Sequence, residues 1–496
     1  MKRPDHKCRQ TTVSSTPQAI CKVGLARVDI TPPIGIYHRM WGAAMHDQAE
    51  GVHRPLSATA LLMEPLEEGA SGRQILLAID HCLLDGEEML RLRQGVASAL
   101  GGQIEEVSIC LSHTHGSGWM SRSRSHLPGG EKIGPYLDDL REKLIEVAKQ
   151  AQKSLAPAHL TYGVGRCNLA AHRDFWDETA GRFVCGFNPD GPADDTLVVV
   201  RISDEAGAVR GVLVNYACHP TTLAWDNRAI SPDWIGAMRE TVEGITGGLC
   251  LFVQGASGEL GPKEGFVGDW AVADRNGRQV GYAVATTLES LPAQTGTEFV
   301  YAGPVISGTW IGTWKHEAVG SAAKKKHQAW RWNQPIVNLT YRAELPTMEE
   351  TLQEKARLEQ LKQEAKASGN IEKERDYHAQ IEQMTRQQFR LASLPAGKCY
   401  PLPVTIGQLG DALWVLVPAE MYQMFQVELR KRFAPRPVIV GTLTNNWQPG
   451  YLPDAVSYGY GIYQDVIAAV APGALEALLE GTVRQLTALL DEENSA

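Results

Sequence analysis

Long apolar runs are the first feature that this sequence lacks. Its longest apolar stretches, such as LCLFV and VIAAVAPGALEALL, are short or interrupted by proline and glycine, whereas a membrane-spanning helix needs about 20 apolar residues. The N-terminus carries basic residues, but no apolar run follows them, so we expect no secretory signal. These absences predict a cytoplasmic protein without stable membrane insertion.

Paired cysteine motifs and basic stripes are also missing. The nine cysteines are scattered without CxxC spacing, and several of them lie inside apolar runs, where a buried free thiol is expected. The formal net charge is -9, and no lysine or arginine stripe stands out beyond the local KKK of residues 324–326. A nucleic-acid partner would require many more clustered positive charges, so we expect none.

What the sequence does contain is an alternation of short apolar runs with amphipathic segments of helical period. This alternation predicts an α/β fold with a layered, mixed-sheet core. We expect residues 1–21 to form a disordered extension and residues 22–496 to form a single domain. One segment, residues 346–393, is instead highly charged, with apolar residues at helical steps and a turn at SGN, residues 368–370.

We interpret residues 346–393 as a helical hairpin inserted into the core. Three roles remain open for it at this stage: a solvated flap, a contact that forms a homo-oligomer, or a lid over an active site.

Five predicted strands end in polar residues that could bind a ligand or take part in catalysis. Because strand ends and the loops that follow them gather at one edge of an α/β sheet, we expect these residues to meet in a single site with a strand-end metal. The five strands are ILLAID ending at Asp80, VSICLSHTH at His115, GVLVNYACH at His219, CLFVQGASGE at Glu259 and LWVLVPAE at Glu420.

Histidines at two of these strand ends suggest metal chemistry. His113 and His115 are separated by one residue and followed by glycines that let the backbone turn, and His219 is followed by a proline that ends its strand. Each histidine taken alone also fits a structural role. A catalytic zinc ion typically has three nitrogen or oxygen ligands from the protein and an open position, and Glu420 could supply the oxygen.

Several short motifs, in their order along the chain, resemble the neutral/alkaline non-lysosomal ceramidase family, in particular its N-terminal catalytic domain and its short bacterial relatives. The resemblance runs with gaps from about residue 23 to about residue 465. The motifs are VGLARVDITPP, GVHRPLSATALLM, HTHGSG, NPDGPADDTLVVVRI, NYACHPTTL, PAEMYQMFQVELRKR and PGYLPDAVSYGYGIYQ.

The resemblance implies a set of site residues. The zinc ligands would be His113, His219, Glu420 and Tyr451. The second histidine of HTH would transfer protons, and a tyrosine and an arginine would bind the scissile carbonyl or its oxyanion. In this sequence these catalytic residues correspond to His115, Tyr463 and Arg173.

Two departures from the family pattern limit what carries over. The family's GDVSP segment reads GELGP here, with Gly261 at the serine position, so we do not expect a serine nucleophile, and Ser257 would need a shifted register. We also expect no immunoglobulin-like domain after the catalytic domain. The resemblance therefore does not imply the lipid substrate of the family. It does imply a small-molecule substrate.

The sequence thus predicts a zinc-dependent hydrolase that cleaves an amide bond of an N-acyl-type substrate through a metal-activated water. The alternatives are an ester or lactone hydrolase with the same site and a protein that binds a small ligand without turnover. Glu259 and Asp233 could act as a base or contact a substrate amine, and each could equally be a helix cap or an ion-pair partner.

Overall fold

A computed structural model describes residues 12–67 and 72–495. An eight-stranded mixed sheet forms the centre of the molecule, with strand order β14-β12-β11-β7-β2-β4-β5-β6. Its strands are β2 (Gln18–Asp29), β4 (Ser57–Glu64), β5 (Gln74–Ile79), β6 (Val107–Leu111), β7 (Ala156–Arg166), β11 (Thr196–Ser203), β12 (Val209–Tyr216) and β14 (Leu249–Gln254). A second sheet has the order β18-β21-β22-β24, formed by β18 (Trp330–Asn333), β21 (Thr405–Leu409), β22 (Ala412–Leu416) and β24 (Val438–Gly441).

The two sheets pack face to face, because the strands of the large sheet are apolar on both faces. Along β11, Val198 and Val200 point into a core shared with Trp414 and Ile439 of the second sheet, while Leu197 and Val199 point to the opposite face. This alternation is the two-residue period of a strand buried on both sides.

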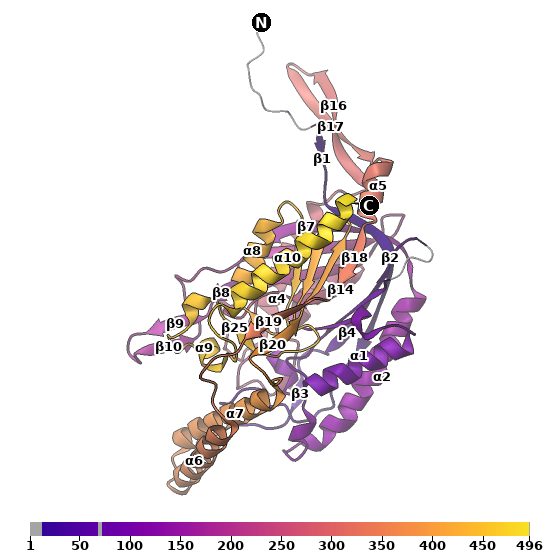
Figure 1. The fold of residues 1–496 in the computed structure, drawn as a ribbon. Helices are drawn as coiled ribbons and strands as arrows, with labels where there is room; N and C mark the ends of the chain where they lie inside the picture. The colour runs from indigo at the N-terminus through magenta and orange to yellow at the C-terminus, as the bar shows by residue number, and fades with distance from the viewer. Residues whose placement is uncertain (1–11, 68–71, 496) are drawn as a thin grey trace.

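Helices cover the outer face of each sheet, which gives four layers (Figure 1). The large sheet is covered by α1 (Gly86–Ala99), α2 (Ile133–Lys153), α3 (Trp234–Thr246) and α4 (Trp270–Glu289), and the second sheet by α8 (Met424–Arg432) and α10 (Ala474–Ser495). The predicted α/β fold with a layered mixed-sheet core is therefore confirmed.

Short strands and helices decorate these layers. They form the pairs β3 (Gly51–Val52) with β13 (Ala229–Ile230), β8 (Ala170–His172) with β15 (Leu260–Pro262), β9 (Asp174–Asp177) with β10 (Arg182–Cys185), β19 (Ile336–Thr340) with β20 (Cys399–Pro403), and β23 (Glu420–Met421) with β25 (Tyr451–Leu452). The remaining helices outside the hairpin are α5 (Ser321–His327) and α9 (Tyr463–Ile467).

The ordered core begins earlier in the chain than predicted. Ala19 and Cys21 are fully buried in β2, which pairs with β4 and β7 in the middle of the large sheet. The predicted boundary between a disordered extension and the domain, at residue 22, is therefore wrong for residues 18–21. The start of this strand mixes small apolar side chains with polar ones, so the sequence shows no clear apolar run there. Residues 1–11 of the predicted extension lie outside the described residues.

Two hairpins project from opposite ends of the molecule (Figure 1). One is formed by β16 (Thr297–Ile306) and β17 (Trp310–Ala318), and β1 (Val13–Ser14) pairs with β16. The other is the predicted helical hairpin, formed by α6 (Met348–Ala367) and α7 (Ile371–Ser393). Within the described residues, no helix is both long enough and apolar enough to cross a membrane.

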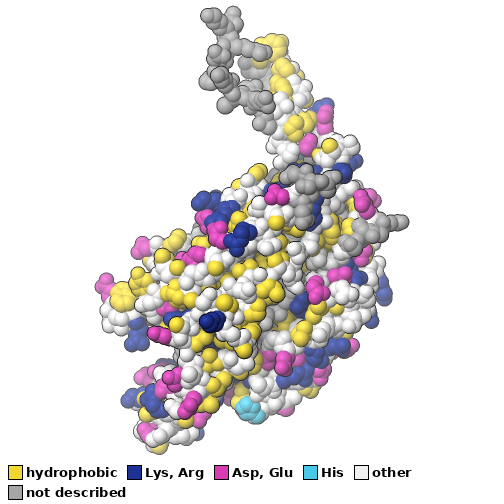
Figure 2. All heavy atoms as spheres, viewed as in Figure 1, with side chains coloured by type: hydrophobic (Ala, Val, Ile, Leu, Met, Phe, Trp, Pro, Cys, Tyr) yellow, Lys and Arg dark blue, Asp and Glu magenta, His cyan; other side chains and the backbone are white. Residues whose placement is uncertain are grey.

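Local sequence explains the hairpin. Thr347 and Glu350 form a capping box at the start of α6, in which each side chain satisfies a free backbone N–H. Asn370 caps α7 by accepting a hydrogen bond from the Lys373 amide. The surface of the hairpin carries acidic and basic side chains side by side (Figure 2).

Candidate metal centre and active site

Three parallel strand pairs bring the predicted site residues to one edge. These pairs are β5 with β6, β12 with β14, and β22 with β24. Hydrogen bonds from the Leu111 amide to the Leu443 carbonyl and from the Thr442 amide to the Gln254 carbonyl join the two sheets there. The carboxyl ends of strands distant in sequence therefore converge on a shared space.

His113 follows β6 at a sharp bend in the backbone. Its φ angle is 64°, unusual for a residue other than glycine, and its amide donates to the His81 carbonyl at 2.8 Å. Its Nδ1 lies 3.1 Å from the Cys82 carbonyl oxygen. A carbonyl only accepts, so Nδ1 carries a hydrogen, and Nε2, which faces Glu420, is the nitrogen that can bind a metal after losing its proton.

His219 follows β12 and is held in the same way. Its Nδ1 lies 2.7 Å from the Ser257 carbonyl oxygen and 3.0 Å from that of Leu260. Burial, followed by the charge of Arg173, lowers the pKa of His219 to about 3, so the imidazole is neutral near pH 7. Its Nε2 therefore also presents a lone pair.

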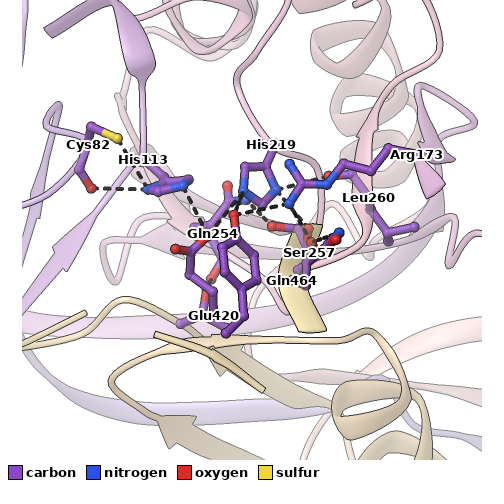
Figure 3. Close-up of polar contacts among 12 residues, drawn as sticks. Cys82, His113, Arg173, His219, Gln254, Ser257, Leu260, Glu420 and Gln464 are labelled. Carbon is purple, nitrogen blue, oxygen red and sulfur yellow. Dashed lines mark hydrogen bonds and ion pairs between the residues drawn. The ribbon is translucent and has the colours of Figure 1, made fainter. Parts of the chain in front are cut away.

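Glu420 lies between the two imidazoles (Figure 3). Its Oε2 is 3.2 Å from His113 Nε2 and 3.2 Å from His219 Nε2. Burial would raise the pKa of this carboxyl, but His113 and His219 lower it well below its usual value. Glu420 is therefore an anion at neutral pH, although it is buried.

Tyr451 is aligned with Glu420 because β23 and β25 run parallel and pair these two residues. Its hydroxyl oxygen is 3.3 Å from His219 Nε2 and accepts a hydrogen bond of 3.0 Å from Arg173. Arg173 is buried and also donates to the Gly258 carbonyl at 2.6 Å. The structure thus brings the four predicted metal ligands and Arg173 together, and Arg173 is not a surface residue.

The donor set fits a metal ion. The ligand atoms of His113, His219 and Glu420 lie within 4.8 Å of one another, and two of the three separations are 3.2 Å. A tetrahedral ion with bonds of about 2.0–2.1 Å holds its ligand atoms roughly 3.3 Å apart. A second group, Cys82 with His113 and His115, also lies close together. We favour the first group, since His113 turns Nε2 toward Glu420 and only its protonated Nδ1 toward Cys82.

His115 and Tyr463 lie beside this centre. The His115 ring packs at 4.8 Å from Trp41 and at 5.0 Å from His113, and neither of its nitrogens has a hydrogen-bond partner among the described residues. Burial, then the nearby imidazoles of His113 and His219, hold the pKa of His115 well below its usual value, which leaves it neutral and able to accept a proton. The Tyr463 ring lies 5.8 Å from that of Tyr451, and its side chain is 44% exposed.

A cavity of about 410 Å³ opens next to these residues. Its reactive side is formed by His115, Arg173, Tyr451 and Tyr463, and a smaller adjoining cavity of about 50 Å³ reaches His113 and Glu420. Apolar side chains form other parts of the wall, among them Met40, Trp41, Trp225, Phe266 and Ile467. The cavity can hold a small molecule with one polar end at the candidate metal centre.

Helix α7 contributes wall residues that the sequence did not point to. Arg386 and Arg390 line both cavities, and Glu382 and Gln383 line the larger one. Arginines spaced by four share a helix face, and this spacing was the available signal. In a segment so rich in charge, however, the same spacing is typical of a solvated face.

The three residues whose roles were open have structural partners. Both carboxylate oxygens of Glu259 accept from the Gln423 amide, and Asp233 caps α3 by accepting from the Trp234 amide. The Ser257 hydroxyl lies 2.6 Å from the Gln254 side-chain amide, which donates to it. None of the three lines either of the two cavities.

Sequence comparison identifies relatives of the N-terminal half. The profile of the family described as neutral/alkaline non-lysosomal ceramidase, N-terminal, matches residues 21–249. A neutral ceramidase of Pseudomonas aeruginosa is 25% identical over 254 residues, which are 49% of this chain and 37% of that protein. Neutral ceramidase B of Dictyostelium discoideum is 24% identical over 239 residues, 45% of this chain and 32% of that protein. The matches thus span only about a third of each relative's length.

Structure comparison extends the likeness to the whole fold. The crystal structure of neutral ceramidase from Pseudomonas aeruginosa matches with a TM-score of 0.64 at 16% identity, covering 94% of this chain and 73% of that chain. A solved structure of a ceramidase complexed with C2 matches with a TM-score of 0.61 at 16% identity, covering 94% and 74%. The profile match and the related sequences show that the N-terminal half of this chain is similar to the neutral/alkaline non-lysosomal ceramidase family, and the structure match shows that the fold is shared over nearly the whole chain.

Proposed function

We propose that this chain is a metal-dependent hydrolase, with zinc as its metal, that cleaves the amide bond of an N-acyl compound. The observation that carries the proposal is the convergence of His113 Nε2 and His219 Nε2 on Glu420 Oε2, at 3.2 Å each, beside the 410 Å³ cavity. Its relatives are named neutral ceramidases, and the amide bond is the part of that chemistry that we carry over.

A bound zinc ion would lower the pKa of a water molecule and polarise a carbonyl group. His113, His219, Glu420 and Tyr451 would hold the ion. The chain's own groups account for the proton transfers and for the binding of the substrate oxygen.

His115 is the candidate for the proton transfers. It is neutral, its ring nitrogens lack partners among the described residues, and it lines the cavity. It can take a proton at one nitrogen and later deliver it to the leaving amine. Arg173 and Tyr463 can donate hydrogen bonds to the carbonyl oxygen as negative charge develops on it.

Metal analysis is the first test of this proposal. We expect about one zinc ion per chain in the wild type and almost none in a His113→Ala, His219→Ala double variant. His126→Ala, which changes an exposed histidine outside the site, serves as the matched control and keeps its metal. A wild type that binds no metal after zinc is added back would contradict the proposal.

Substrate comparison tests the reaction itself. Zinc-loaded wild type should release amine from N-acyl amides, and His115→Gln should slow this release while metal content stays unchanged. If only esters or lactones are cleaved, the proposal of amide hydrolysis is wrong, but the proposed active site is still supported. If ligands bind without turnover, the protein is a binding protein. Oligomerisation through the α6–α7 hairpin stays a prediction.

A further inference from the structure

Arg390, on the cavity side of α7, forms no ion pair with any residue that the structure describes. Its side chain is 9% exposed, and it lines both the large cavity and the small one that reaches His113 and Glu420. Among the described residues, its guanidinium forms neither a hydrogen bond nor an ion pair. Burial lowers the pKa of Arg390, but an arginine stays protonated at neutral pH.

The neighbouring arginines differ from Arg390 in this respect. Arg386 donates to Glu382 at 2.9 Å and to the Met40 carbonyl at 2.5 Å, and Arg124 shares the same glutamate at 2.7 Å. Glu382 is therefore already the counter-ion of both Arg386 and Arg124. No carboxylate in the described residues forms a pair with Arg390, and the closest metal-site carboxylate, Glu420, lies beyond ion-pair distance.

A cation that is so little exposed and lacks a counter-ion is destabilising, so its position beside a candidate active site needs a reason. Its position supplies one. A Cβ placed on Gly450 would lie 4.0 Å from Arg390 Cδ, so the stem of Arg390 packs next to the turn that carries Tyr451. The guanidinium is therefore positioned beside the space that a substrate would occupy.

We propose that Arg390, assisted by Arg386, binds an anionic group of the substrate, and that the enzyme selects amides that carry a carboxylate near the scissile bond. A guanidinium binds a carboxylate through two parallel hydrogen bonds and so fixes its orientation as well as its charge. The apolar wall formed by Trp41, Trp225 and Phe266 receives the rest of the molecule. This inference rests on the proposed hydrolase function.

Two matched substrate pairs test the inference with zinc-loaded, full-length protein. In the first, N-acetylphenylalanine is compared with N-acetylphenethylamine, which lacks only the carboxylate on the amine side. In the second, N-succinylphenethylamine is compared with N-propanoylphenethylamine, which lacks only the carboxylate on the acyl side. We expect kcat/KM to favour the acid in at least one pair by about 10- to 100-fold, the usual value of a hydrogen bond to a charged group.

Three variants assign that preference to Arg390. Arg390→Met should abolish it by lowering kcat/KM for the acid alone, and Arg390→Lys should keep part of it. Arg375→Met is the control, since Arg375 lies on the same helix, pairs with Asp376 and lines neither of these cavities. Metal content measured on every variant shows that the folded site is retained.

Three kinetic results would overturn the inference. The first is equal rates for acid and neutral substrates in both pairs, and the second is a preference that survives Arg390→Met. The third is a fall in kcat by the same factor for acid and neutral substrates in Arg390→Met, which would assign Arg390 to charge developed during the reaction.

A binding measurement separates this inference from the proposed function. If zinc-loaded wild type cleaves none of the four amides, calorimetry with N-acetylphenylalanine and N-succinylphenethylamine decides. Binding to wild type that is lost in Arg390→Met supports the anion site while the hydrolase proposal fails for these amides. No binding to wild type would reject the anion site.

Discussion

The candidate metal centre and the α6–α7 hairpin face the same cavity but are built in opposite ways. The metal centre consists of residues that follow buried strands of two packed sheets, and its imidazoles are fixed by backbone carbonyls. The hairpin reaches the cavity through charged side chains of α7, held by ion pairs and aromatic contacts. The comparison suggests that chemistry resides in the rigid part and substrate selection in the inserted part.

Removing the Glu420 carboxylate should have the largest effect of these changes, and the effect should be confined to the metal centre. Glu420→Gln takes away the anion between His113 and His219, so we expect loss of metal and a fall in kcat/KM by roughly four orders of magnitude. The hairpin should stay docked, because no hydrogen bond or ion pair among the described residues joins it to this carboxylate. Elemental analysis with amide hydrolysis measures the first part, and hydrogen exchange of α7 measures the second. Glu428→Gln, on α8, is the control.

Breaking the ion-pair network of α7 should have the opposite result: the hairpin loosens and the metal stays bound. The Glu382 side chain is 12% exposed and neutralises both Arg124 and Arg386. Glu382→Gln leaves two cations without a counter-charge, which we expect to destabilise hairpin docking by about 3 kcal/mol. Faster hydrogen exchange in α7 with normal metal content would show this.

The control for that experiment is Glu354→Gln, which removes an exposed pair with Arg357 on α6 and should have almost no effect. Loss of metal in Glu382→Gln would show that the two regions are not separable.

A steric change at the contact between hairpin and body should have a smaller effect. A Cβ at Gly42 would lie 3.0 Å from both Cα and Cβ of Ala379 on α7. Gly42→Val should therefore push the hairpin outward and raise KM about tenfold, with little change in metal content. The comparison variant is Gly51→Val, since nothing lies within 4 Å of a Cβ placed there. Equal KM values for the two variants would refute the steric argument.

Acidification should have the smallest of these effects on the docking of the hairpin. Burial, and then the charges of Arg39 and Lys362, lower the pKa of His378 on α7 to about 4. The unfolded value is about 6.5, so the docked hairpin disfavours protonation. Its docking is fully stabilised above pH 6.5 and weakens as the pH falls toward 4. Hydrogen exchange of α7, corrected for intrinsic rates, should increase over this range in wild type and less in His378→Gln.

Sequence reasoning located most of the candidate site because strand ends leave a readable pattern. A buried strand that ends in a histidine or glutamate is visible as an apolar run, and this pattern pointed to His115, His219 and Glu420. The residues matched by family resemblance, Tyr451 and Arg173, lie in short loops and strands with no such pattern. Their proximity to the metal ligands became visible only in three dimensions.

By itself, the sequence determined the layered α/β fold, the strand ends and the position of the helical hairpin, because these follow from local periodicity and turn residues. Tertiary structure decided where charged side chains point. Glu259, predicted as a candidate site residue, binds a backbone amide, whereas Arg390, in a segment that resembles a solvated helix, faces the cavity. A helix with few apolar residues does not specify its buried face, so the packing of α7 against the sheet edge made that choice.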